Sequence, residues 1–376
     1  MKVGVPSEIK TDEYRVALTP AGVRELVDAG HSVVVQAGAG VGSAIADADY
    51  ASQGAQVLPD ADAVFAEAEM IVKVKEPQPE EVARLEPRHT LFTYLHLAPD
   101  PELTQGLVAS GATCIAYETV EDKGGRLPLL APMSEVAGKI ATQAGAFMLE
   151  KPLGGRGILL GGVPGVAAGK VLVIGGGVVG TNAAIIALGM QAETYVFDRN
   201  VDRLRALEIE LNGAASTCYA STLEIEQRLP EADMVIGAVL VKGGKAPHVI
   251  TREQLGLMKP DAVLVDVSID QGGCFETSRA TTHSDPTYEV DGIQHYCVAN
   301  MPGAVPITST YALTNATMPY MIKLATMGAP EALASDPGFM AGLNVAGGKV
   351  TYEPVARDQG LDYTPPGEAL AALAAA

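Results

Sequence analysis

The sequence predicts an α/β protein of two domains, each built on a mainly parallel sheet, that flank a cleft. Short runs rich in valine and isoleucine alternate with helical stretches, as a parallel sheet with helical crossovers requires. These runs are apolar at successive positions, which is typical of strands covered on both faces by helices. The 376 residues exceed what one hydrophobic core usually serves, so two domains are expected.

The first domain is expected to contain five strands before residue 130. Proline, glycine or charged residues end most of these apolar runs. A helix is expected at Pro20–Ala29, between the first two strands. The expected strands are Lys2–Val5, Ser32–Gln36, Met70–Val74, Leu91–Leu95 and Thr113–Glu118.

A second strand and helix series begins after residue 130. A long helical stretch, Pro132–Leu149, and a glycine-rich turn, Gly154–Gly169, precede it. A series of this kind indicates a second α/β unit. Its expected strands are Lys170–Ile174, Glu193–Phe197, Met234–Leu240, Ala262–Val267 and His295–Ala299.

The end of the chain is helical again, over Tyr320–Met327 and Pro330–Ala334, and closes in an alanine-rich tail. We expect this closing segment to pack on the first domain, which makes that domain discontinuous. The predicted domains are therefore residues 1–130 plus 305–376 and residues 131–304.

The excess of acidic residues limits the classes of partner. Lys and Arg number 26 against 45 Asp and Glu, which gives a formal net charge of -19. Because this charge repels nucleic acid and anionic lipid, we expect neither as a partner. The sequence holds no apolar run long enough to span a bilayer, and its first ten residues carry charges where a signal peptide needs an apolar run.

The four cysteines are scattered and form no C-x-x-C pair: Cys114, Cys218, Cys274 and Cys297. This spacing is typical of reduced thiols and differs from a disulfide framework or a zinc site. The sequence therefore predicts a cytoplasmic protein without a metal site.

A dinucleotide-binding motif opens the second domain. The buried run Lys170–Ile174 leads into Gly175-x-Gly177-x-x-Gly180, and a helical stretch follows. The first glycine allows the tight turn, the second lets the backbone approach a pyrophosphate, and the third lets the helix pack on the strand. The motif alone is weak, but the strand before it and the helix after it predict a Rossmann-like domain.

Asp198 ends the next expected strand, close to the expected offset of about 20 residues from the glycines. A carboxylate there accepts hydrogen bonds from the ribose hydroxyls of NAD and repels the 2′-phosphate of NADP. The alternatives are a capping or surface aspartate, and a site in which the adjacent Arg199 tolerates the phosphate. We expect NAD.

Four ionisable residues stand at or just beyond strand ends, where ligands of open α/β sheets bind. Arg15, Lys75 and His96 belong to the first domain and Asp270 to the second, as a site between two domains requires. Each also has an ordinary alternative: a solvated arginine or lysine, a core histidine, or a turn-capping aspartate.

Around these residues the sequence resembles alanine dehydrogenases, a family shared with the nucleotide-binding subunit of proton-translocating transhydrogenases. The similarity runs from residue 1 to about residue 328, and the combination of segments is more specific than any one motif. The segments that carry it are Glu8–Pro20, Val72–Pro77, Leu91–His96, Gly165–Val166, Gly175–Gly180, Val265–Val267, Asp270–Gly273 and Asn300–Ala304.

The resemblance implies two Rossmann-like domains, NAD as cofactor, and reversible oxidative deamination of L-alanine to pyruvate and ammonium by a homohexamer. It makes His96 and Asp270 the general acid and base, and Arg15 and Lys75 the substrate-binding residues. The first domain then holds the substrate and the second holds NAD. The expected cofactor contacts are Ser134, Gly175, Gly177, Val178, Gly180, Asp198, Arg203, Val239, Leu240, Val267, Ser268, Ile269, Arg279, Val298, Asn300 and Met301.

Three positions depart from the family pattern. Ala220 separates Tyr219 from Ser221 where a serine usually follows the tyrosine, which puts an adenosine contact in doubt. The run 241–244 replaces a more usual Pro-Gly turn, and Ser268 stands where alanine is common. None of these changes removes a chemical group.

Other functions stay open on the sequence alone. A transhydrogenase hydride subunit is disfavoured because Lys75 and His96 are both present. Another small amino-acid dehydrogenase, or a saccharopine- or lysine-forming dehydrogenase, is a further alternative. An NAD-binding sensor on an inactive enzyme fold is the non-enzymatic alternative.

Overall fold

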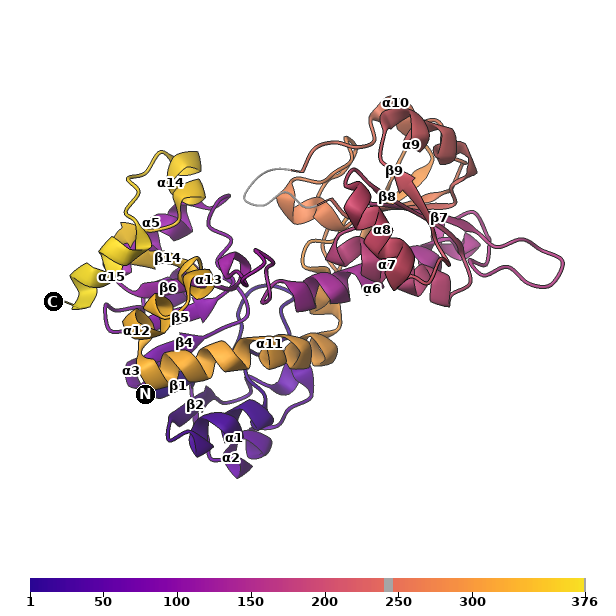
Figure 1. Cartoon of the computed structure of the whole chain (residues 1–376). Helices are drawn as coiled ribbons and strands as arrows, with labels where there is room; N and C mark the ends of the chain where they lie inside the picture. Colours follow the sequence, from indigo (N-terminus) through magenta and orange to yellow (C-terminus); the bar gives the residue numbers. More distant parts are fainter. Residues whose placement is uncertain (240–245, 375–376) are drawn as a thin grey trace. The chain divides into compact units, whose positions relative to one another are not determined.

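The computed structural model describes residues 1–239 and 246–374 (Figure 1). The chain forms two compact units, the first made of Met1–Met133 with Val305–Ala376 and the second of Ser134–Ala304. Of the sequence-based expectations, Leu240 and the run 241–244 lie outside the described residues.

The first unit is built on an eight-stranded sheet with the order β15-β14-β6-β5-β4-β1-β2-β3. The six strands from β1 to β6 are parallel, whereas β14 and β15 are antiparallel to their neighbours. Its strands are β1 (Lys2–Val5), β2 (Ser32–Gln36), β3 (Gln56–Leu58), β4 (Met70–Val72), β5 (Thr90–Thr93), β6 (Thr113–Ala116), β14 (Leu343–Ala346) and β15 (Lys349–Val350).

Helices with clear start signals cover this sheet. The Thr19 side chain caps α1, Asp60 caps α3 and Asp100 caps α5, each accepting a backbone N–H of the first turn. The helices are α1 (Pro20–Asp28), η1 (Val41–Ser43), α2 (Asp47–Ser52), α3 (Ala61–Glu67), α4 (Pro79–Val82), α5 (Pro101–Ser110), η2 (Tyr117–Thr119), α11 (Pro306–Met327), α12 (Ala329–Ala334), α13 (Pro337–Met340), α14 (Glu353–Gln359) and α15 (Pro366–Ala374).

The C-terminal segment is an integral part of the first unit. Figure 1 shows α11 as a long helix beside α1, and β14 pairs with β6. Inside the unit, the hydroxyl of Thr310 accepts the backbone N–H of Val16 at 3.1 Å, and that of Thr314 donates to the carbonyl of Ala17 at 3.3 Å. Helix α11 therefore stabilises the loop that follows β1.

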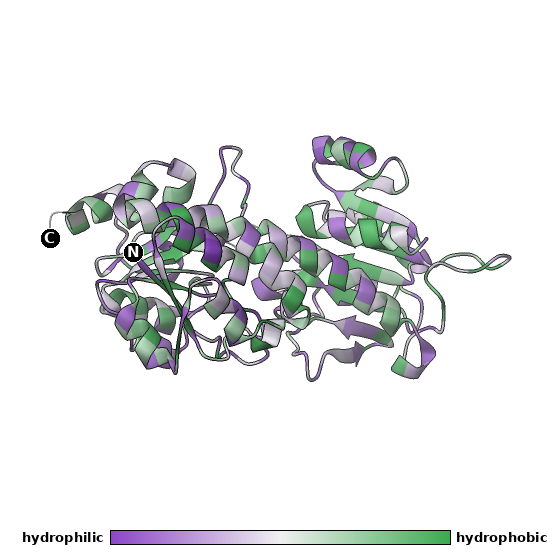
Figure 2. Cartoon of the chain, turned by 90° about the horizontal axis from the view of Figure 1, so that it is seen from below, coloured by the Kyte–Doolittle hydropathy of each residue, from purple (hydrophilic) through white to green (hydrophobic). Residues whose placement is uncertain are grey.

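The second unit has a seven-stranded sheet with the order β12-β13-β11-β10-β7-β8-β9. Only β12 is antiparallel, and the other six strands follow the 3-2-1-4-5-6 order of dinucleotide-binding sheets. Residues of its inner strands form a hydrophobic core, and Figure 2 shows green, hydrophobic strands in this unit beside purple, hydrophilic ones. They are β7 (Lys170–Ile174), β8 (Glu193–Asp198), β9 (Ser216–Tyr219), β10 (Met234–Gly237), β11 (Val263–Asp266), β12 (Thr287–Val290) and β13 (Ile293–Tyr296).

The helices of this unit include α7, which starts at the glycine-rich turn and is twelve residues long. Helix α6 begins in the first unit, at Ala131, and continues into the second. The elements are α6 (Ala131–Met148), η3 (Lys151–Leu153), α7 (Val178–Gly189), α8 (Val201–Glu210), α9 (Thr222–Arg228), η4 (Leu229–Glu231), α10 (Arg252–Leu255), η5 (Val267–Gln271) and η6 (Met301–Ala304).

The predicted fold class of two mainly parallel α/β domains is confirmed. The parallel strands lie in the order β3-β2-β1-β4-β5-β6 in the first unit and β9-β8-β7-β10-β11-β13 in the second. Both units therefore have the same Rossmann-like topology. Edge strands β3, β9, β12 and β15 and the antiparallel β14 were not predicted. Within the described residues, no helix is both long enough and apolar enough to cross a bilayer.

Candidate active site

The first unit places three predicted site residues after three parallel strands. Arg15 follows β1, Lys75 follows β4 and His96 follows β5. Strands β1 and β4 are neighbours at the point where the strand order reverses, and β5 is next to β4. Carboxyl ends of strands at such a point form the ligand-binding edge of an open α/β sheet. The topology therefore groups these three residues at one edge.

Arg15 is held by a buried carboxylate. Its Nε donates to Glu13 Oε1 at 2.6 Å and its Nη2 to Glu13 Oε2 at 2.5 Å, and the residue is only 3% exposed. Burial disfavours the charge, but the hydrogen bonds and charge of Glu13 outweigh it and raise the pKa of Arg15. The guanidinium is thus a fixed cation with a defined plane, which suits a carboxylate ligand.

Lys75 lies beside another buried carboxylate. Its Nζ is 3.7 Å from Glu76 Oε2, and the two side chains are 10% and 12% exposed. Glu76 also pairs with Lys10 and lies 3.2 Å from His96 Nδ1. This one carboxylate therefore connects two of the predicted site residues.

His96 has an unusual backbone conformation. Its φ is 48°, in the left-handed region that non-glycine residues rarely adopt. The carboxylate of Glu118 accepts the N–H of His96 at 2.6 Å and that of Leu95 at 3.1 Å, which holds the strained turn. The ring stacks on Tyr94 with centroids 5.7 Å apart, and the Tyr94 hydroxyl donates to Leu129 O at 2.6 Å. His96 is therefore fixed at both its backbone and its ring.

A buried ion triad supports the segment that carries Lys75. Lys73 Nζ lies 3.0 Å from Glu8 Oε2 and 2.6 Å from Glu81 Oε1, and all three side chains are at most 2% exposed. Glu8 Oε1 also accepts the N–H of Val74 at 2.6 Å. Burial raises the pKa of Glu8 and the Lys73 charge only partly offsets it, whereas the two carboxylates raise the pKa of Lys73 against its own burial.

Lys73→Met should destabilise the protein because it leaves two carboxylates buried without their cation. Breaking a buried ion pair from one side costs about 3–5 kcal/mol, which corresponds to a Tm lower by at least about 6 °C in a unit of this size. Thermal unfolding followed by circular dichroism measures this loss. Lys349→Met, at an exposed lysine of β15, is the matched control and should leave the Tm unchanged. Equal Tm values for both variants would show that the triad does not support the fold.

In the second unit, the Gly175–Gly180 turn has the shape that a pyrophosphate requires. Gly175 has φ +106°, and a Cβ there would lie 2.4 Å from Ala238 O. A Cβ on Gly180 would lie 1.8 Å from Gly175 O, so only glycine allows α7 to pack on the turn. A Cβ on Gly177 meets nothing within 4 Å, which leaves open space before the N-terminus of α7. The chain therefore fits a dinucleotide phosphate here.

Asp198 organises this turn from the end of β8. Its Oδ2 accepts the N–H of Gly176 at 2.8 Å and its Oδ1 that of Asn200 at 2.8 Å. A carboxylate offers about four acceptor positions, so both oxygens retain capacity for ribose hydroxyls. Arg199 is exposed and forms no ion pair within the described residues.

Arg203 contacts the same turn. Its Nε donates to Gly176 O at 2.6 Å, its Nη2 to Thr181 Oγ1 at 2.7 Å, and its Nη1 to Glu210 Oε1 at 2.8 Å. These bonds brace the glycine turn against α7 and α8. Arg203 also lines a hollow of about 360 Å³ together with Gly177 and Val178, so the cofactor contact that the resemblance implies stays a prediction.

Asp270 lies in a short 3-10 helix, η5, directly after β11, and its side chain is exposed. The loop is organised by Asp266, which is fully buried and accepts the N–H of Ser268 at 2.9 Å, the N–H of Cys274 at 2.8 Å and the hydroxyl of Ser278 at 2.5 Å. Burial raises the pKa of Asp266, although these donors oppose the shift. Asp266 therefore sets the backbone path that presents Asp270.

The other expected cofactor residues differ in exposure. Ser268 is buried and donates to Val239 O at 2.7 Å, Arg279 lies 3.9 Å above the Tyr288 ring, and Asn300 has φ 62°. Val298 is fully buried. Val178 is exposed, Ser134 and Val267 are half-buried, and Ile269 and Met301 are buried.

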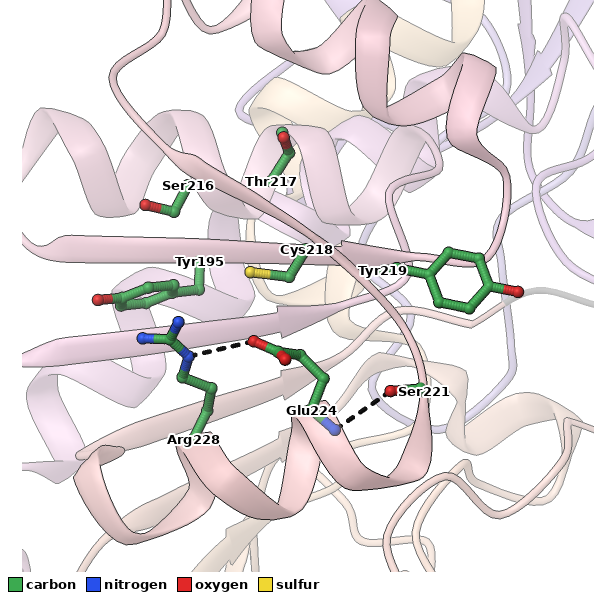
Figure 3. Close-up of a pocket in the computed structure, with 8 residues that line it drawn as sticks. All are labelled: Tyr195, Ser216, Thr217, Cys218, Tyr219, Ser221, Glu224 and Arg228. Carbon is green, nitrogen blue, oxygen red and sulfur yellow. Dashed lines mark hydrogen bonds and ion pairs between the residues drawn. The ribbon is translucent and has the colours of Figure 1, made fainter.

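A shallow hollow of about 540 Å³ lies at the β9 edge of the second unit (Figure 3). Its wall includes Ser221, whose hydroxyl accepts the N–H of Glu224 at 3.2 Å and caps α9. Tyr219 is 54% exposed and points away from the Arg228 and Glu224 pair. Ser221 is thus engaged in helix capping, whereas Tyr219 presents an exposed ring.

Four carboxylates that organise the site were not singled out from the sequence: Glu13, Glu76, Glu118 and Asp266. Glu76 had a visible signal, since it directly follows Lys75. Asp266 is an acidic residue at the end of an otherwise apolar strand, with apolar residues on both sides in the sequence, which indicates a buried hydrogen-bond centre. Glu13 and Glu118 carry no comparable local signal.

These features define a class: a two-unit α/β protein with a dinucleotide-binding turn in one unit and a fixed arginine, lysine and histidine in the other. Models of the two domains of the alanine dehydrogenase/PNT family match residues 4–137 (N-terminal domain) and 141–353 (C-terminal domain). The chain belongs to this family, which confirms the resemblance. Membership makes it an oxidoreductase of a family that uses a nicotinamide dinucleotide, and the glycine turn fits that cofactor.

Relatives support the assignment over nearly the full chain. Alanine dehydrogenase of Halomonas elongata is 59% identical over 96% of this chain and 98% of its own length. Alanine dehydrogenase of Mycolicibacterium smegmatis is 55% identical over 99% and 100%. A solved L-alanine dehydrogenase structure is 50% identical with a TM-score of 0.92, covering 95% of this chain and 99% of its own. A transhydrogenase from Sinorhizobium meliloti, 24% identical with a TM-score of 0.80 over 94% and 99%, shares the fold.

Proposed function

We propose that the chain is an NAD-dependent alanine dehydrogenase. It converts L-alanine, NAD⁺ and water to pyruvate, ammonium, NADH and a proton, and it catalyses the reverse reductive amination. The structural observation that supports this most directly is the grouping of Arg15, Lys75 and His96 after β1, β4 and β5. A hydride exchange between nucleotides needs no such amino-acid site.

The two units then have different tasks. Residues 1–130 plus 305–376 bind the substrate and carry catalytic groups, and residues 131–304 bind NAD. Arg15 binds the substrate carboxylate, and Lys75 stabilises negative charge that develops on the carbonyl oxygen. The fixed guanidinium plane and the buried environment of the Lys75 ammonium group support these roles.

His96 and Asp270 perform the proton transfers. When bound, NAD accepts the hydride from the α-carbon of the substrate. His96 takes a proton from the substrate and returns it in the reverse direction, and Asp270 activates the water that attacks the imine of the substrate. The exposed carboxylate of Asp270, on a loop fixed by Asp266, supports this role.

The cofactor contacts follow from the second unit. Gly175, Gly177 and Gly180 accept the pyrophosphate at the start of α7, and Asp198 accepts the ribose hydroxyls. Further contacts are proposed, directly or through the backbone, for Ser134, Val178, Arg203, Val239, Leu240, Val267, Ser268, Ile269, Arg279, Val298, Asn300 and Met301. Arg203 also braces the glycine turn.

Absorbance at 340 nm tests the activity. We expect NADH to form when NAD and L-alanine are both present, and more slowly with glycine or L-serine in place of alanine. Turnover limited to lysine with 2-oxoglutarate, in which NADH is consumed and absorbance falls, would identify a saccharopine-type enzyme. Exchange between reduced and oxidised nucleotides without any amino acid would identify a transhydrogenase subunit. NAD binding without turnover of any substrate would identify a sensor.

We further propose a homohexamer in the cytoplasm. The turn at 159–166 of the second unit exposes Leu159, Val163 and Val166 by 68%, 53% and 63%, and such apolar side chains are typical of an interface between copies. Light scattering should give six times the mass of one chain. The double variant Val163→Asp, Val166→Asp should form smaller assemblies. The control Lys349→Glu, at an exposed lysine of β15, should keep the assembly size of the unmodified protein. An unmodified protein that is monomeric would contradict the proposed hexamer. Cell fractionation tests the proposed location, and we expect the protein in the cytoplasmic fraction.

A further inference from the structure

Glu76 lies at the centre of the charged groups of the first unit. Its Oε2 lies 3.2 Å from His96 Nδ1 and 3.7 Å from Lys75 Nζ, and its Oε1 pairs with Lys10 Nζ. The side chain is 12% exposed, whereas that of His96 is 36% exposed. The carboxylate is therefore buried behind the imidazole rather than presented to solvent.

The surroundings of Glu76 keep it ionised. Burial alone raises the pKa of a carboxyl group, but the hydrogen bond with His96, the charge of Lys75 and the hydrogen bond with Lys10 together hold the pKa of Glu76 far below its ordinary value. An ionised carboxylate has no proton to donate, so it can only accept a hydrogen bond from the ring. The Nδ1 atom of His96 must then carry the hydrogen, whichever charge the ring has.

The other ring nitrogen is in a different position. Within residues 1–239 and 246–374, Nε2 of His96 makes no hydrogen bond. Glu118 fixes the backbone of His96 and Tyr94 stacks on its ring, so the direction of the imidazole is set. If Nδ1 carries the hydrogen of the neutral ring, Nε2 has a lone pair that can accept a proton.

We propose that Glu76 is the positioning residue of His96: it selects the Nδ1–H tautomer and thereby makes Nε2 the proton-transfer atom. This inference rests on the proposed function of His96. In alanine oxidation the substrate proton moves to the Nε2 lone pair, the ring becomes an imidazolium, and Glu76 remains a carboxylate that stabilises this charge. In the reverse reaction the same proton leaves Nε2, so no other proton carrier is needed at this step.

Glu76→Gln should lower kcat by at least about 10-fold and by up to about 10⁴-fold, the loss known for a carboxylate that orients a catalytic histidine. An amide can accept at its oxygen or donate at its nitrogen, so the tautomer is no longer selected. Glu76→Asp retains the carboxylate and should recover part of the loss. The control is Glu80→Gln, an exposed carboxylate four residues along the chain, which should leave kcat unchanged.

A double-variant cycle separates a role through His96 from a role through Lys75. If Glu76 acts through His96, adding Glu76→Gln to His96→Ala should cause no further loss of kcat. An additional loss as large as that of the single variant would assign Glu76 to Lys75 or to general stability and overturn the proposal. If His96→Ala alone retained full activity, the proposed function of His96 would fail instead, which is a distinguishable outcome.

Imidazole resonances give a readout that does not depend on turnover. The chain has six histidines, and nitrogen-15 labelling at about pH 9 resolves the two neutral tautomers, with His96 assigned by its absence in His96→Ala. We expect the Nδ1–H form in the unmodified protein and in Glu76→Asp, and a mixture in Glu76→Gln. An Nε2–H form in the unmodified protein would contradict the proposal.

Discussion

His96→Ala and Asp270→Asn should each reduce kcat for alanine oxidation by at least about 10²-fold, because positioned acid–base catalysis supplies about 10²–10⁴ in rate. His96 is presented by a left-handed backbone that Glu118 stabilises, and the Asp270 loop is folded around buried Asp266. Neither side chain contributes to a hydrophobic core. The variants should therefore lose turnover while they retain the fold.

Controls of the same chemical type make this result specific. His31→Ala replaces a histidine on the loop before β2, and Asp285→Asn an exposed aspartate before β12, and both should retain turnover. NAD binding by His96→Ala, measured by calorimetry, should be close to that of the unmodified protein because the glycine turn belongs to the other unit. Near-normal turnover in His96→Ala or Asp270→Asn would remove that residue from the proposed acid–base pair.

The unmodified protein should prefer NAD over NADP by at least about 10²-fold in kcat/KM, or about 2.7 kcal/mol. The Asp198 carboxylate and a 2′-phosphate about 4 Å apart repel by roughly 4 kcal/mol per charge pair at an effective dielectric near 20. Arg199 is expected to point away, since successive side chains at a strand end face opposite sides. Asp198→Ala should narrow the preference, mainly by improving use of NADP and only modestly by weakening use of NAD.

The hydrogen bond from Gly176 to Asp198 refines this experiment. Asp198→Ala removes an acceptor of the glycine turn as well as a charge, whereas Asp198→Asn removes the charge and retains an acceptor. Both variants should gain kcat/KM for NADP, and Asp198→Asn should retain more of the activity with NAD. Asp202→Asn, at an exposed aspartate of α8, is the control. Comparable kcat/KM for the two cofactors in the unmodified protein would show that Arg199 reaches the phosphate.

The sequence predicted the strands that are apolar and central. The run Lys170–Ile174 has the predicted bounds because both of its faces are buried. Edge strands were missed because their sequences are short or polar, as in the STCY of β9. The strand β14 was missed because its pairing with β6 joins segments more than 200 residues apart, which no local pattern encodes.

The candidate site was predictable where topology alone places a residue. Arg15, Lys75 and His96 could be selected because they follow strands whose carboxyl ends share one edge. Their supporting carboxylates could not be selected in the same way. Glu118 bonds the backbone of His96 across 22 residues, and Glu8 pairs with Lys73 across 65, and only the folded chain brings such groups together.

The stoichiometry of the reaction tests the central proposal most directly. With the unmodified protein, L-alanine and NAD, the proposal predicts that NADH, pyruvate and ammonium accumulate in equal amounts, each quantified by an independent assay. Addition of pyruvate, ammonium and NADH should run the same reaction backward to L-alanine. Nucleotide reduction or exchange without equal formation of pyruvate and ammonium would contradict the assignment as an alanine dehydrogenase.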